Sequence, residues 1–196
     1  ALNEAHKIFH DVEAAAFFIS EAGFEGEVIV VDDGSTDGTA GAARKASLPS
    51  SVALNVIRLE KNSGKGFAVK TGIKETRGEV VLSADSGRCI PYSNSLGVIK
   101  KILAGSLDLA LASRLHENSV IHINRNFKRR LLSWLFHQAT VWIVGLPRWI
   151  TDSQCGFKVY KGEIARKLFD KCITPGYIFE LEILLRALKC GYRIAV

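Results

Sequence analysis

Cysteine motifs are absent from this sequence of 196 residues. The four cysteines, at positions 89, 155, 172 and 190, are widely spaced, with no Cys-x-x-Cys pair and no zinc-finger spacing to a histidine. We therefore expect free thiols in a reducing compartment, not a structural zinc site. No apolar run reaches the roughly 18 residues of a membrane-spanning helix, so none is predicted.

Two phosphate-binding signatures are also missing. Gly66 follows Lys65 where a Walker A loop needs Ser or Thr, and no Gly-x-Gly-x-x-Gly segment follows a predicted strand. No nucleic-acid-binding module is recognisable, so no nucleic-acid partner is expected. What is present is 47% apolar residues and a net charge of +6. These values are typical of a globular domain that meets an anionic partner, such as a nucleotide or an acidic membrane surface.

Strand-like and helix-like segments alternate through residues 1–114. Apolar runs at 27–31, 52–59, 79–84 and 107–112 predict strands, and each is followed by a helical pattern. The alternation predicts a single α/β domain, with a mostly parallel sheet and helices on both faces. Residues 1–4 resemble the start of a helix that follows a strand, and residues 193–196 resemble the start of a strand. We therefore expect both ends to be truncated.

An acidic turn follows the first predicted strand. The β-branched run at 28–31 leads into Asp32 and Asp33, and a Gly-Ser pair then ends the strand. Ligands of open α/β sheets bind at the carboxyl ends of strands, so both acids are candidate site residues. Thr36 or Asp37 can cap the helix that follows. The alternative is an acidic turn with a purely structural role.

The segment Val-Val-Asp-Asp-Gly-Ser-Thr-Asp-Gly-Thr at 30–39 resembles the nucleotide-binding segment of family 2 glycosyltransferases, which have the Rossmann-like GT-A fold. The Asn-Glu pair at 3–4 and the segment Asn-Ser-Gly-Lys-Gly at 62–66 match further motifs of that family. The resemblance implies a nucleotide-sugar-binding half at 1–114 and an acceptor-side half at 115–196. Residues implied in donor binding are Asn3, Glu4, Asp32, Asp33, Gly64, Lys65 and Ala84.

The metal motif of the family is altered here. Most members carry Asp-x-Asp at the end of the third predicted strand, where the acids bind Mg²⁺ or Mn²⁺ against the donor diphosphate. This sequence has Ser83 at the first position and keeps Asp85, which becomes the expected metal ligand and a catalytic candidate. A hydroxyl is a weaker ligand than a carboxylate, so a catalytically silent nucleotide-sugar-binding domain stays an alternative.

Basic residues precede an apolar segment in the second half. Ser113-Arg114 and the later Lys-Arg-Arg run resemble the polyprenyl-phosphate branch of the family, and the resemblance implies that Arg114, Arg129, Arg130 and Ser133 hold an acceptor phosphate. A solvated basic face is the alternative. The apolar segment at 131–150 contains three tryptophans. It predicts an amphipathic helix at a membrane surface, or a helix packed on the sheet.

Two further segments resemble the family. Asp-Ser-Gln-Cys-Gly-Phe-Lys at 152–158 resembles its dolichyl-phosphate glucosyltransferase branch, which implies that Asp152 lies near the reacting centre, with Gln154 beside it. Phe-Glu-Leu-Glu at 179–182 matches a helix of the family. Glu180 and Glu182 are two residues apart and do not share a helix face, and the match favours Glu182 as a structural or acceptor-side residue.

The resemblance implies inverting transfer of a sugar, glucose from UDP-glucose, to dolichyl or other polyprenyl phosphate. GDP-mannose is the alternative donor, and a soluble acceptor is a further alternative. A phosphate monoester has a second pKa of about 6, so the acceptor is mostly deprotonated and Asp152 need not act as a strong base. We expect membrane association on the cytoplasmic side, at the endoplasmic reticulum if the source is eukaryotic.

Overall fold

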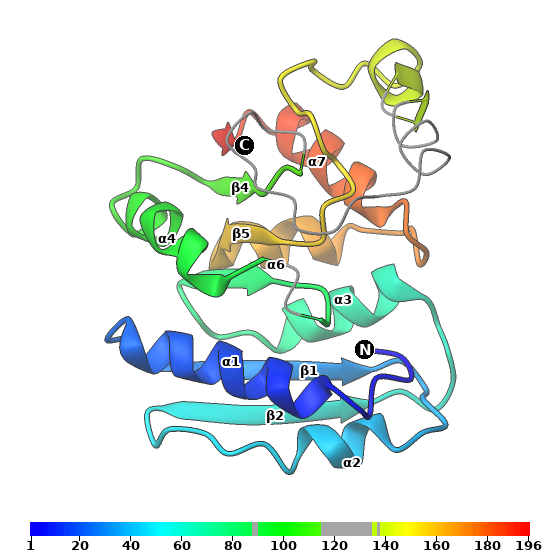
Figure 1. The fold of residues 1–196 in the computed structure, drawn as a ribbon. Coiled ribbons are helices and arrows are strands. Elements are labelled where there is room, and N and C mark those ends of the chain that lie inside the picture. Colours follow the sequence, from blue (N-terminus) through cyan, green and yellow to red (C-terminus); the bar gives the residue numbers. More distant parts are fainter. Residues whose placement is uncertain (88–89, 115–134, 137) are drawn as a thin grey trace.

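The computed structural model describes residues 1–87, 90–114, 135–136 and 138–196 (Figure 1). Residues 135–136 and 138–142 are helical. The other elements are α1 (Ile8–Glu21), β1 (Gly26–Asp32), α2 (Thr39–Ala43), β2 (Val52–Arg58), α3 (Lys65–Glu75), β3 (Val80–Ser83), the 3-10 helix η1 (Tyr92–Ser95), α4 (Leu96–Leu103), β4 (Leu109–Leu111), β5 (Lys158–Lys161), α6 (Gly162–Asp170), α7 (Phe179–Lys189) and β6 (Ile194–Ala195).

The strands of the described residues form two sheets. β1 and β2 pair in parallel, with Gly26 opposite Val52 and Asp32 opposite Arg58. The second sheet has the order β3-β5-β4-β6, in which β4 and β6 are parallel and β5 is antiparallel to both β3 and β4. The α/β architecture is confirmed. β5 was not predicted as a strand, because its four residues begin and end with lysine and show no long β-branched run.

Helices cover both faces of the four-stranded sheet, as predicted. Val81 of β3 and Tyr160 of β5 belong to the core shared with α6 and α7. Leu82 and Val159, one position along the same two strands, belong to the core under α4. Successive side chains of a strand point to opposite faces. The two helix layers therefore lie on opposite sides of the sheet (Figure 1).

The two-stranded sheet has its own small core. Ile8, Val12 and Ala16 of α1 recur every four residues and are buried. The first two pack with Val30 of β1 and with Ala43. This apolar face fixes α1 against the two-stranded sheet. Among the described residues, no helix combines the length and apolar character needed to span a membrane.

Candidate functional site

The acidic turn after β1 is held by the backbone. Asp32 is 1% exposed and accepts hydrogen bonds from the backbone N–H of Ser35 (2.9 Å) and Ala40 (3.2 Å). Asp33, also buried, accepts from the N–H of Ser63 (2.7 Å) and Gly64 (3.0 Å). Asp33 therefore joins the acidic turn to the glycine-rich segment. The predicted contact of these acids with a nucleoside stays a prediction.

The Asn-Glu pair near the start of the chain lies against the same turn. Asn3 accepts a hydrogen bond from the N–H of Thr36 (3.0 Å), and the N–H of Glu4 donates to the hydroxyl of Thr39 (2.8 Å). Asp37 accepts from the N–H of Thr39, the first residue of α2 (3.0 Å), but the N-cap position is Gly38 and no side chain caps the helix, so the predicted cap at Thr36 or Asp37 is wrong. Segments about 30 residues apart in sequence, both implied in donor binding by the resemblance, are thus brought together.

The glycine-rich segment places Lys65 at the start of α3. Gly64 has φ 98°, and a Cβ there would overlap the carbonyl oxygen of Pro175. The glycine therefore allows a close approach of the 174–176 loop. Lys65 Nζ lies 2.8 Å from Asp85 Oδ1 and 3.4 Å from Glu180 Oε1. Burial by itself lowers the pKa of Lys65, but the hydrogen bonds and charges of these two acids outweigh it and raise the pKa.

Asp85 joins two of the predicted motifs. It follows β3 just after Ser83 and Ala84, and its side chain is 48% exposed. A Cβ built on Gly156 would overlap the carboxylate of Asp85. The Gln-Cys-Gly segment is therefore packed directly against Asp85. The structure thus brings together the metal motif and the segment that contains Asp152.

Of two charged residues of the site, the sequence analysis did not single out Lys158, and it favoured Glu182 over Glu180. Lys158 of β5 and Glu180 of α7 form an ion pair, and the two residues are 1% and 4% exposed. Lys158 also donates to the carbonyl oxygens of Ser153 (3.3 Å) and Cys155. Since Glu180 also contacts Lys65, a continuous series of ion pairs connects the half-exposed Asp85 with the buried Lys158. Lys158 is the last residue of the Gln-Cys-Gly-Phe-Lys segment, and the resemblance of that segment to the family could have indicated Lys158 as a site residue.

Glu182 has a structural role, one of the two that the sequence analysis allowed. It accepts hydrogen bonds from the backbone N–H of Ile173 (3.1 Å) and Thr174 (2.9 Å) and from Arg186 Nε (2.8 Å). Burial alone would raise its pKa, but these hydrogen bonds lower it to about 2. Of the two glutamates at the start of α7, Glu180 contacts Lys65, and Glu182 holds the backbone of the 173–174 loop instead.

Arg114 and Asp152 form a two-pronged ion pair beyond the end of β4. Arg114 Nε lies 2.6 Å from Asp152 Oδ2, and Arg114 Nη2 lies 2.8 Å from Asp152 Oδ1. Asp152 is buried, and the adjacent hydroxyls of Ser113 and Thr151 are 2.6 Å apart. The hydrogen bonds that Arg114 donates to Asp152 raise the pKa of Arg114 above its ordinary value. The guanidinium predicted to hold an acceptor phosphate thus contacts the predicted catalytic acid.

Gln154 lies in the same segment as Asp152. Its Nε2 atom is buried and has no hydrogen-bond partner among the residues that the structure describes. Cys155, Cys172 and Cys190 are free, in agreement with the expected thiols. The predicted acceptor residues Arg129, Arg130 and Ser133 lie outside the described residues, as does Cys89.

The donor set around Asp85 fits a divalent metal only in part. A half-exposed carboxylate is a suitable ligand for Mg²⁺ or Mn²⁺, and the Ser83 hydroxyl precedes it by two residues. Within the described part of the chain, no group of three or more His, Cys, Asp or Glu residues could hold a metal. A metal at Asp85 would therefore need the oxygens of a bound diphosphate and of water to complete its coordination.

The fold and the site define the class of this protein. It is an α/β domain of the GT-A type, with its charged candidate residues following the carboxyl ends of β1, β3 and β4. The family model for glycosyl transferase family 2 matches residues 19–169, and the chain belongs to this family.

Curated relatives share one name. A dolichyl-phosphate beta-glucosyltransferase of Saccharomyces cerevisiae is 35% identical over 95% of this chain and 60% of the relative. A protein of the same name from Homo sapiens is 36% identical over 82% of this chain and 51% of the relative. The chain thus spans between about half and three fifths of the length of these two relatives.

Solved structures agree on the fold. The glucosyl-3-phosphoglycerate synthase from Mycobacterium tuberculosis, in complex with Mn²⁺, UDP-glucose and phosphoglyceric acid, is 22% identical with a TM-score of 0.68. The mannosyl-3-phosphoglycerate synthase from Rubrobacter xylanophilus is 20% identical with a TM-score of 0.65. Both cover all of this chain, which spans 65% and 63% of theirs.

Proposed function

We propose that this protein transfers glucose from UDP-glucose, with inversion, to dolichyl or another polyprenyl phosphate. The observation that carries the proposal is the assembly of Asp85, Gly156 and the Arg114–Asp152 pair from the segments that resemble this branch of the family. The shared name of the relatives supports both the acceptor and the transferred sugar.

The residues of the site suit the transfer of a sugar from a nucleoside diphosphate to a phosphate acceptor. An oxygen of the acceptor phosphate attacks C1 of the sugar, and the bond from C1 to the nucleoside diphosphate breaks. Negative charge then builds up on the leaving diphosphate, and the ammonium group of Lys65 lies beside the place where Asp85 would hold a metal. A bound Mg²⁺ or Mn²⁺ supplies further charge neutralisation. Catalysis rests on alignment and on this charge stabilisation.

Asp152 is a positioning acid in this proposal. Two hydrogen bonds from Arg114 fix the orientation of its carboxylate, and the deprotonated acceptor phosphate makes a strong general base unnecessary. The buried amide of Gln154 is available to donate to an oxygen of a ligand. The side chain of Arg114 is 37% exposed, so an acceptor phosphate can reach its guanidinium group although that group is paired with Asp152.

Exposed apolar side chains support a membrane-bound acceptor. Trp142 is 73% exposed, Ile143 82% and Trp149 49%. Tryptophans in such positions suit the boundary between lipid headgroups and acyl chains. In Figure 1 this segment lies at the same end of the molecule as the start of α7. We propose that this surface meets the cytoplasmic face of a membrane.

A silent nucleotide-sugar-binding domain is the second candidate, and Ser83 favours it. A hydroxyl replaces one metal-binding carboxylate, and the carboxylate of Asp85 pairs with Lys65. Such a domain would bind the donor without turning it over.

The test is a transfer assay with a short-chain polyprenyl phosphate in detergent, with UDP-glucose or GDP-mannose as donor, and with Mn²⁺ or a chelator. We expect metal-dependent transfer from UDP-glucose, a loss of at least 100-fold for Asp85→Asn and tighter metal binding for Ser83→Asp. Transfer from GDP-mannose but not from UDP-glucose would change the proposed donor to GDP-mannose. Donor binding without transfer, with activity gained in Ser83→Asp, would establish the silent domain.

A further inference from the structure

An acid of α1 holds the backbone next to the metal motif. Asp11 is 7% exposed, and its Oδ2 atom accepts hydrogen bonds from the Ser86 hydroxyl (2.7 Å) and from the Gly87 N–H (2.8 Å). These two donors belong to the residues that directly follow the half-exposed Asp85. Asp11 and Ser86 are 75 residues apart in sequence, so the contact depends on the tertiary structure.

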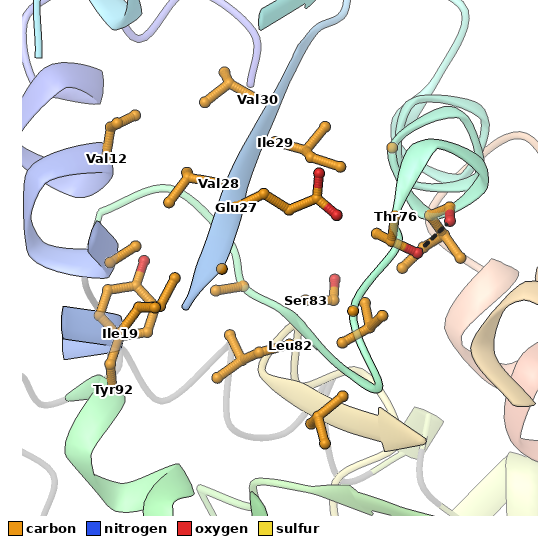
Figure 2. Close-up of a pocket in the computed structure, with 18 of the residues that line it drawn as sticks. Val12, Ile19, Glu27, Val28, Ile29, Val30, Thr76, Leu82, Ser83 and Tyr92 are labelled. Carbon is orange, nitrogen blue, oxygen red and sulfur yellow. Dashed lines mark hydrogen bonds between the residues drawn. The ribbon is translucent and has the colours of Figure 1, made fainter. Parts of the chain in front are cut away.

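Asp11 lies at the border of the cavity between the two sheets. This cavity has a volume of about 820 Å³, and its lining includes Asp11 and the residues 83–86 at the end of β3. Figure 2 shows Val12, the next residue of α1, and Ser83 of β3 among the lining residues. α1 and the metal motif thus border the same cavity, and the carboxyl group of Asp11 connects them by hydrogen bonds.

α1 also contacts Tyr92, further along the chain from Asp85. The rings of Phe18 and Tyr92 are stacked, with their centroids 6.1 Å apart. Phe18 and Asp11 are two helical turns apart and therefore lie on the same face of α1. This face thus makes one apolar and one polar contact with residues that follow β3, and the polar contact is the one beside Asp85.

Helix stability alone does not explain the burial of Asp11. An acid in the first turn of α1 is favoured by the helix dipole, but that effect needs no burial. Burying a carboxyl group is costly unless hydrogen bonds compensate for the lost water. Glu13, on the same helix, is half buried and accepts from the backbone N–H of Ser47 (3.1 Å), which belongs to none of the predicted motifs. Glu13 therefore offers a matched control.

The altered metal motif makes the backbone at Asp85 important. Ser83 replaces the first acid, so Asp85 is the single carboxylate that the motif retains. Lys65 Nζ and Gly156 contact its side chain, whereas Asp11 holds the backbone just after it. A ligand that is already oriented loses less conformational freedom when it binds. Groups that orient a metal ligand without touching the metal typically change metal affinity about 10- to 100-fold.

We propose that Asp11 is a positioning residue for Asp85. By holding the Ser86 hydroxyl and the Gly87 N–H, it fixes the turn after β3 and thereby directs the Asp85 carboxylate towards a divalent metal. Gly87 has φ 108°, so the chain takes a conformation that favours glycine at the residue that Asp11 binds. The inference rests on the proposed function, in which Asp85 holds a metal against the donor diphosphate.

The experiment measures two affinities separately. Electron paramagnetic resonance gives the binding of Mn²⁺ in the presence of UDP, corrected for the Mn²⁺ that UDP binds by itself. Calorimetry with a chelator gives the binding of UDP without metal. The variants are Asp11→Ala, Ser86→Ala and the double variant, with Glu13→Ala as the control. Unfolding temperatures show whether each variant is folded, and Ser86→Ala, at a half-exposed residue, tests the same contact should Asp11→Ala fail to fold.

We expect Asp11→Ala to weaken Mn²⁺ binding by about tenfold or more and to leave metal-free UDP binding within about twofold of the wild type. Ser86→Ala removes one of the two hydrogen bonds and should weaken Mn²⁺ binding by about threefold. The double variant should be no weaker than Asp11→Ala, because Asp11 is the partner through which Ser86 acts. Glu13→Ala should keep the Mn²⁺ affinity of the wild type.

Unchanged Mn²⁺ affinity in folded Asp11→Ala and Ser86→Ala would overturn the proposal. Equal losses in Asp11→Ala and Glu13→Ala, or a parallel loss of metal-free UDP binding, would do the same, because they would indicate a purely structural role. A wild-type chain that binds no Mn²⁺ with UDP would also overturn it. A wild-type chain that binds Mn²⁺ with UDP but transfers no glucose would contradict only the proposed transfer, and the comparison of Asp11 with Glu13 would still decide this inference.

Discussion

β4 carries an arginine–aspartate pair at each of its two ends, and the two pairs are nearly alike in geometry. At the amino end, Arg193 Nη2 lies 2.7 Å from Asp108 Oδ1 and its Nε lies 3.0 Å from Oδ2. At the carboxyl end, Arg114 and Asp152 repeat the arrangement at 2.8 and 2.6 Å. In both, the carboxylate also accepts a hydrogen bond from the backbone N–H of its arginine.

The surroundings of the two pairs differ. Arg193 also donates to the carbonyl oxygen of Gly105 (2.6 Å), so the first pair fastens the strand β6 to the loop before β4. The second pair lies in the segment whose Gly156 packs on Asp85 and whose Gln154 has a buried amide without a partner among the described residues. Ligands of α/β sheets bind at the carboxyl ends of strands. The same ion pair thus supports the fold at one end and, in our proposal, catalysis at the other.

The largest expected effect is a test of this contrast. Asp152→Asn should lower transfer activity about 1000-fold, roughly 4 kcal/mol of transition-state stabilisation, because the charge that orients Arg114 is lost. Asp108→Asn, the matched control, should keep activity within threefold. Steady-state kinetics and unfolding temperatures of both variants give the comparison. Equal losses of activity in the two would mean that the ends of β4 do not differ in this way.

A second effect concerns the buried pair that links the site to the core. Glu180→Ala leaves the ammonium group of Lys158 buried without its acid, which should lower the free energy of unfolding by roughly 3 kcal/mol. The double variant with Lys158→Met should recover part of this loss, because it removes the uncompensated charge. Urea unfolding measures both. A single variant as stable as the wild type would show that water reaches Lys158.

The acid stability of the protein should depend on Glu182. Its pKa is about 2 in the folded protein, below the ordinary value of 4.5. The ionised form therefore stabilises the fold at neutral pH, and this contribution is lost as the pH falls from about 4.5 towards 2. Glu182→Gln should cost about 2 kcal/mol at pH 7, and this cost should shrink below pH 4.5 and disappear once the pH is below about 2. A stability difference between the two proteins that does not change with pH would contradict this role.

The smallest effect is expected at the acidic turn. Asp32→Asn keeps one carbonyl acceptor but replaces the other oxygen by a donor that faces the N–H of Ser35 or Ala40. The cost should be about 1–2 kcal/mol in the free energy of unfolding. Thr36→Ala, on the exposed side of the same turn, is the control and should change stability by less than about 0.5 kcal/mol. Denaturant unfolding distinguishes the two.

The alternation of strands and helices and the acidic turn after the first strand could be predicted, because each rests on residues near one another in the chain. β5 could not be predicted in the same way. It is short, and it is a strand because β3 and β4 flank it on both sides. Its position next to these two strands depends on contacts between residues about 50 to 80 positions apart.

The candidate site divides in the same manner. The sequence by itself determined which segments carry carboxylates and cations, since strand ends and turns follow from local patterns. Only the tertiary structure decided which charge meets which: Arg114 with Asp152, Lys65 with Asp85, and Glu180 instead of Glu182 facing Lys65. The physical reason is that ion pairing depends on distances of a few ångströms between side chains from different elements, and packing of the whole domain sets those distances.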